Sequence, residues 1–75
     1  FSYIIKIADF YYEDSAKMMQ KRIEQEVKIN SSNIENISST TFRVYLGPFN
    51  NLKSLKKAFD GISALNFENI EIIKL

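Results

Sequence analysis

Apolar and polar residues alternate in several short stretches of the chain, as in strands that bury one face. The clearest stretch covers residues 42–46, with three apolar residues on one side and two polar ones on the other: Phe42, Val44 and Leu46 against Arg43 and Tyr45. Gly47-Pro48 follows, and because proline has no amide hydrogen for a sheet ladder, we expect the strand to stop there. Residues 3–10 show the same order of aromatic, apolar and small positions. The chain therefore reads as a duplicated unit.

Two longer stretches have apolar residues at helical spacing. The first comprises Ala16, Met19, Ile23 and Val27, and the second Leu52, Leu55, Ala58, Phe59, Ile62 and Leu65. We expect one helix over residues 13–27, with Asp14 or a neighbour as its N-cap. We expect the second to be capped by Asn50 or Asn51 and to end near Asn66. Met18 and Met19 are expected to fill the core.

Three further strands are expected at residues 2–8, 34–37 and 69–75, the second as a hairpin partner at the sheet edge. The element order is then βαββαβ. This order predicts an α+β fold of the split βαβ type, which is ferredoxin-like and RNP-like: a four-stranded antiparallel sheet with two helices on one face. A chain of 75 residues has room for a single domain, residues 1–75.

One face of such a sheet has no helices over it. Because a charged Lys6 is costly to bury, Tyr3, Ile5 and Ile7 should face the core and leave the even-numbered residues outside. The residues expected on the open face are Ile4, Lys6, Ala8, Thr41, Arg43, Tyr45, Glu71 and Ile73. In this topology the first and third strands are neighbours. The pattern therefore predicts a shallow platform with two cations and one aromatic ring.

The amino-acid composition excludes several classes of function. The net charge is +1, whereas nucleic-acid modules usually have a concentrated basic excess. The chain has neither cysteine nor histidine, so disulfides, thiolate nucleophiles and zinc fingers are excluded. No nucleophile–base pair is visible, and we expect no enzyme activity, no metal and no cofactor. A core this small has little room for an enclosed substrate cavity, so we expect the functional site on the surface.

No apolar run approaches the ~20 residues that span a bilayer. The sequence starts at Phe1, which suggests a domain excised from a longer envelope protein. Any targeting signal or anchor would lie upstream, and we expect contact with a membrane only through that anchor. A monomer is expected.

The two strand ends resemble the motifs of the SPOR (sporulation-related repeat) family. Its members typically have V-Q-V-G-S-F in the first strand and Y-R-V-R-V-G-P-F in the third. This chain has I-K-I-A-D-F at residues 5–10 and F-R-V-Y-L-G-P-F at residues 42–49. The resemblance spans essentially the whole chain, closely in the second motif and in outline in the first. It implies the βαββαβ fold and binding of septal peptidoglycan, specifically denuded glycan strands from which amidases have removed the stem peptides.

The resemblance also implies a set of glycan-binding residues, which together with the open-face pattern comprises Ile4, Lys6, Asp9, Arg43, Tyr45 and Ile73. Lys6 stands where the family has glutamine and Asp9 where it has serine. Thr41 stands where some members have tryptophan, so Tyr45 or Phe42 would have to supply the ring. The expected location is the periplasm, at the septal ring of the cell envelope. The attached protein would be a lytic transglycosylase of the rare lipoprotein A type, an amidase or a division protein.

The chemistry of the ligand agrees with this set. A denuded glycan exposes lactyl carboxylates, and a guanidinium such as that of Arg43 matches a carboxylate with two parallel hydrogen bonds. Two other functions compete. The open face could bind a second protein or a second copy of itself, which exposed Ile4 and Ile73 would favour. RNA is disfavoured, because base stacking needs rings on both central strands and the first strand offers none.

Overall fold

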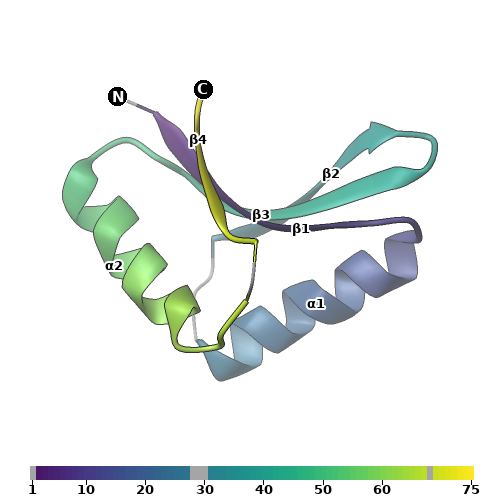
Figure 1. The fold of residues 1–75 in the computed structure, drawn as a ribbon, viewed down its shortest axis with the longest axis horizontal. Helices are drawn as coiled ribbons and strands as arrows, with labels where there is room; N and C mark the ends of the chain where they lie inside the picture. Colours follow the sequence, from purple (N-terminus) through teal and green to yellow (C-terminus); the bar gives the residue numbers. More distant parts are fainter. Residues whose placement is uncertain (1, 28–30, 68) are drawn as a thin grey trace.

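A computed structural model of the protein describes residues 2–27, 31–67 and 69–75. Its six elements follow the βαββαβ order that the hydrophobic pattern predicts (Figure 1). They are β1 (Tyr3–Phe10), α1 (Glu13–Glu26), β2 (Ser32–Ser38), β3 (Thr41–Phe49), α2 (Leu52–Ser63) and β4 (Glu71–Lys74). The described β2 is longer than the expected strand at residues 34–37, and β4 is shorter than the expected strand at residues 69–75.

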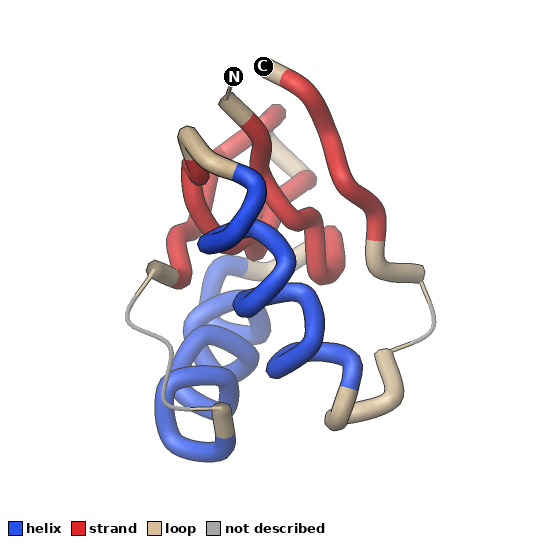
Figure 2. Tube along the Cα trace, turned by 90° about the vertical axis from the view of Figure 1, so that its left-hand side faces the viewer, coloured by secondary structure: helices blue, strands red, loops and turns tan. Residues whose placement is uncertain are grey.

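The four strands form one antiparallel sheet in the order β2-β3-β1-β4. β1 and β3 are the central neighbours, and β2 is an edge strand, as expected. Both helices lie on one side of the sheet, below the strands in Figure 1 and also in Figure 2. No helix of the described chain covers the opposite side. The prediction of an α+β fold with two helices on one sheet face is confirmed.

The core lies between the sheet and the two helices. Its largest fully buried side chains come from both layers: Ile5, Val44 and Leu46 from the sheet, and Ile23 and Ile62 from the helices. Burial of one such side chain stabilises the fold by about 1.5–3 kcal/mol. These contacts attach the helices to one face of the sheet and leave the other face without a helix over it. Neither described helix is long and apolar enough to cross a membrane.

β3 does not stop at Gly47-Pro48, as the sequence led us to expect. Gly47 has a φ of 114°, the register shifts there, and the strand resumes with Phe49 paired to Tyr3. A bulge tolerates proline because its extra residue needs no ladder hydrogen bond. Phe49 is therefore a strand residue with its ring in the core, rather than the start of a new element.

The two helices begin differently. Tyr12 is the N-cap residue of α1 and makes no side-chain cap, so the expected cap at Asp14 was wrong. Asp14 lies with Glu13 in the first turn, where a carboxylate interacts favourably with the helix dipole. At α2 the expected cap is confirmed: the Asn51 side chain accepts a hydrogen bond from the backbone N–H of Ser54 at 2.8 Å.

Two expectations were wrong, the burial of Met18 and the position of the C-terminal end of α2. Met18 points into solvent with 74% of its surface exposed, while Met19 packs against the core. Ile72 lies on the helix-facing side of the sheet with Ile5, and it is 45% exposed because β4 is an edge strand. α2 ends at Ser63, and Asn66 adopts a left-handed φ of 57° in the turn that follows.

Candidate functional site

A bulge in β1 decides which side chains reach the open face. The register against β3 slips at Ile7, so that the next residue, Ala8, pairs with the buried Val44. Because side chains alternate along a strand, this slip moves Ala8 to the core side and brings Asp9 to the same face as Lys6. The expectation that Ala8 lies on the open face was wrong. Polar residues three positions apart, Lys6 and Asp9, were the sequence signal of this slip.

Asp9 is the centre of a chain of ion pairs on the open face. Arg43 donates from Nε to Asp9 Oδ1 at 2.8 Å and from Nη2 to Oδ2 at 3.2 Å. Lys6 Nζ lies 3.7 Å from Asp9 Oδ2 and 3.5 Å from Glu71 Oε2. The side chains of Lys6, Asp9 and Arg43 are 22%, 31% and 25% exposed, so solvent and a ligand can reach all three.

These contacts stabilise the charged forms of the groups. The hydrogen bonds from Arg43 hold the pKa of the Asp9 carboxyl below its usual value, and the Lys6 ammonium adds to this effect. In return, the Asp9 carboxylate raises the pKa of Arg43, with smaller contributions from Glu35 and Glu71. The open face therefore presents two cations together with three carboxylates. The sequence predicted the cations but not that both would be paired within the chain.

The other predicted site residues lie on the same face. Tyr45 is the register partner of Lys6 and is half-buried. Ile4 and Ile73 are partners of each other in neighbouring strands. Ile4 is only 8% exposed, since it lies in a central strand, and so offers a ligand little surface. All six predicted residues thus share one face, with Lys6, Asp9 and Arg43 in direct contact.

A groove of about 400 Å³ adjoins the ion-pair cluster at the edge of β1, next to the residues that precede β4. Its lining comprises Lys6, Ile7, Ala8, Asp9, Phe67 and Asn69. Phe67 was not predicted as a site residue. The guanidinium carbon of Arg22 lies 5.3 Å from the centroid of the Phe67 ring. This cation–π contact links α1 to the connection before β4. No periodic pattern marks Phe67 or Asn69 in the sequence, because both lie outside the helices and strands.

The described residues contain no group of three acidic, histidine or cysteine side chains that could hold a metal ion. The described residues define an α+β module whose open sheet face presents paired charges and has a shallow groove beside it.

The particular fold within this class is that of a SPOR domain. The structure is similar to the crystal structure of the SPOR domain of RlpA from Pseudomonas aeruginosa, with a TM-score of 0.75. The similarity covers 97% of this chain and 99% of that one, at 16% sequence identity. No protein-family model matches the sequence, and no curated protein matches it. At this identity the similarity establishes the fold, which is the one that the sequence motifs implied.

Proposed function

We propose that this domain is a non-catalytic module that binds bacterial peptidoglycan through the open face of its sheet. The ligand is the denuded glycan strand, and binding brings an attached envelope protein to the division septum in the periplasm. The observation that supports this proposal most directly is an arginine held in place on the open face of a SPOR-type fold.

The way Asp9 holds Arg43 leaves half of the guanidinium available. Asp9 takes the side formed by Nε and Nη2. A guanidinium has five N–H donors, and its end, formed by Nη1 and Nη2, can bind a second carboxylate. No hydrogen bond from Nη1 to another described residue is found. A lactyl carboxylate of the glycan would bind at this end.

Neighbouring side chains suit the sugar rings. Tyr45 presents a half-buried ring beside Lys6, and Phe67 lines the adjoining groove. The apolar faces of pyranose rings pack against such side chains, while Asn69 and Lys6 can bond to hydroxyl groups. A sugar chain could then run from the open face into the groove.

Selectivity for denuded strands follows from the same contact. In intact peptidoglycan the lactyl group is an amide carrying the stem peptide, so it offers Arg43 neither the negative charge nor the second oxygen. The peptide also adds bulk above the sheet. Glu35 and Glu71 repel an anionic ligand, and we therefore expect binding to depend on the few carboxylates that reach Arg43 and Lys6 directly.

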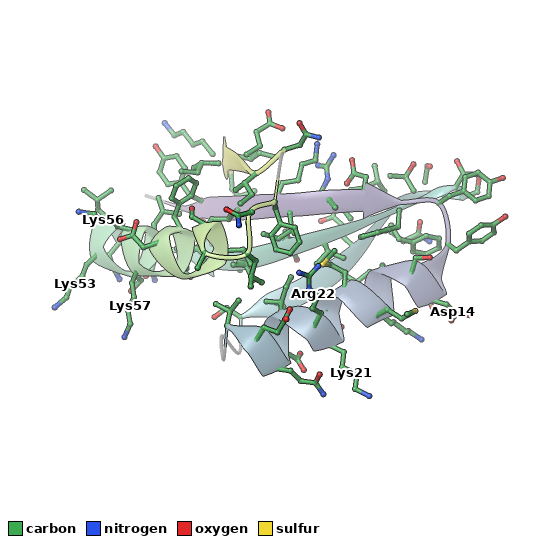
Figure 3. All side chains as sticks on the ribbon, turned by 60° about the horizontal axis from the view of Figure 1, so that its bottom comes forward. Asp14, Lys21, Arg22, Lys53, Lys56 and Lys57 are labelled. Atoms are coloured by element: carbon green, nitrogen blue, oxygen red, sulfur yellow. The ribbon has the colours of Figure 1, made fainter. Side chains whose placement is uncertain are left out.

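Retention on sacculi tests the proposal. Sacculi treated with amidase should retain the domain more strongly than untreated sacculi. Arg43→Ala should reduce retention about tenfold, because a hydrogen bond to a charged group contributes roughly 1.5–3 kcal/mol. Lys6→Ala should reduce it less. Lys21→Ala is the matched control, since Lys21 points away from the sheet on α1 (Figure 3). Unchanged retention of Arg43→Ala would remove the proposal.

The competing functions lose support in the structure. Association through the open face relied on two exposed apolar residues, Ile4 and Ile73, and Ile4 is buried. Binding of RNA requires rings on both central strands, whereas Tyr45 of β3 has Lys6 as its partner in β1.

A further inference from the structure

Positive charge gathers where α2 begins. α2 carries Lys53, Lys56 and Lys57 against one acid, Asp60, and Lys74 of β4 is exposed at the same end of the sheet. The rest of the chain has six cations and eight acids. A net charge near zero therefore hides a separation of charge along the molecule, and such a separation orients a protein on a charged surface.

The strand register places Lys74 on the same side as α2. Tyr3 pairs with Phe49 in β3 and with Lys74 in β4, so these three residues form one row across the sheet. Residues in one row share a face, and Tyr3 and Phe49 pack against the core beneath the sheet. Lys74 consequently projects toward the helix side, at the end of the sheet where Phe49 leads into α2.

An apolar groove of about 240 Å³ lies between α2 and β4, with Lys56 in its lining. Its lining comprises Leu52, Leu55, Lys56, Phe59 and Ile72. Two of these apolar side chains are exposed, Leu52 to 68% and Ile72 to 45%. Exposed apolar side chains that adjoin one another inside a polar rim mark a binding surface. Figure 3 shows Lys53, Lys56 and Lys57 spreading outward from α2, away from the sheet.

We infer that this end of the domain docks on an anionic lipid bilayer. Leu52 and Ile72 enter the boundary between headgroups and acyl chains, and the lysine ammonium groups contact lipid phosphates. The sequence led us to expect membrane contact only through an anchor upstream, and this surface adds a second contact made by the domain itself. The glycan site lies on the opposite face of the sheet, so both can be occupied together.

The choice of cation favours a bilayer over a protein partner. All four cations are lysines, which act as flexible point charges and suit a diffuse layer of phosphates. Arginine, which is enriched in protein interfaces where lysine is depleted, is absent from α2 and β4. On the open face, by contrast, the residue that meets a carboxylate in fixed geometry is Arg43.

Cosedimentation with lipid vesicles tests this inference. The domain should bind vesicles of phosphatidylglycerol and phosphatidylcholine in equal parts, and not vesicles of phosphatidylcholine alone. Each lysine near an anionic surface strengthens binding about fivefold, so Lys53→Gln/Lys56→Gln/Lys57→Gln should weaken it about a hundredfold. Leu52→Ser tests the apolar part and should also weaken binding. Lys17→Gln/Lys21→Gln, on α1, is the matched control and should bind as the unaltered domain does.

Several outcomes would overturn the inference. These are no binding to the anionic vesicles, equal binding to both kinds of vesicle, or equal losses in the α2 variant and the α1 control. Self-association that the α2 variant abolishes, seen by sedimentation equilibrium without lipid binding, would assign the surface to a second copy. A leucine-containing polyglutamate peptide that binds where vesicles do not would assign it to an acidic partner. Retention on denuded sacculi should be the same in the α2 variant, so this test is independent of the glycan proposal.

Discussion

Asp9 binds Arg43 through two hydrogen bonds, from Nε at 2.8 Å and from Nη2 at 3.2 Å, although 34 positions separate the two residues in the sequence. A carboxylate of the protein thus occupies the Nε side of the guanidinium, and we assign the remaining end to the carboxylate of the ligand. This pair both orients Arg43 and offsets its charge. The two effects can be separated by substitution.

Asp9→Asn should raise affinity for denuded glycan about fivefold at low salt. The asparagine oxygen can still accept a hydrogen bond from Arg43, but one negative charge beside the ligand is removed, and a unit charge at about 4 Å is worth roughly 1 kcal/mol in water. Calorimetric titration with denuded glycan fragments at low and high salt measures this gain. Asp60→Asn, on α2, is the control for net charge and should have no effect. A fall in affinity would show that Arg43 needs the full carboxylate to keep its orientation.

The Asp9–Arg43 pair should also make stability depend on pH. The pKa of Asp9 is lowered in the folded state, chiefly by the hydrogen bonds from Arg43, relative to its unfolded value of 3.8. The stabilisation is therefore fully present above about pH 4 and is lost as the pH falls through the folded pKa. Urea unfolding of the unaltered domain and of Asp9→Asn measures the difference in free energy. That difference should shrink below pH 4, and a constant difference down to about pH 2.5 would contradict the prediction.

Gly47→Ala should destabilise the fold by about 1–3 kcal/mol. Gly47 has a positive φ of 114°, and an added Cβ would lie 3.1 Å from the carbonyl oxygen of Tyr3 and 3.1 Å from the backbone nitrogen of Phe49. Both of these contacts are backbone atoms of paired strands, which cannot move away easily. Gly61→Ala, within α2, is the matched control and should stabilise the domain by up to about 1 kcal/mol. Equal unfolding midpoints for the two variants would contradict this account.

Asn51→Ala should lower stability by about 1 kcal/mol, because the side chain caps α2 through the N–H of Ser54. For a domain of this size the melting temperature should fall by about 4–8 °C. Asn50→Ala is the control, since the side-chain oxygen of Asn50 accepts only a long hydrogen bond from Asn51, at 3.4 Å. If both substitutions lower the melting temperature equally, the cap is not the cause.

Much of the fold follows from local sequence patterns. Alternation around Val44 and helical spacing around Ile23 and Ile62 each require one buried side, and the three residues are fully buried. Asn51 was predictable as a cap because capping depends on neighbouring residues alone. Strand ends were less predictable, since β3 continues through Gly47-Pro48 only because Tyr3 pairs with Phe49 beyond it.

The candidate site depended more on the tertiary structure. Sequence motifs and the open-face pattern predicted Lys6, Asp9 and Arg43 as glycan-binding residues. The register slip at Ile7 is what brings Asp9 against Arg43. Phe67 joins the site only because the chain returns past the edge of β1.

By itself, then, the sequence determined the order of the elements, which side of most strands is buried, and the similarity of the fold to SPOR domains. These depend on the period of apolar residues and on short motifs. The tertiary structure decided that both open-face cations are ion-paired and that the lysines of α2 share one end with Lys74. Such relationships depend on register between distant strands. A slip of one residue reverses the face of every later side chain, and the spacing of Lys6 and Asp9 alone does not specify which residues of the distant strand they meet.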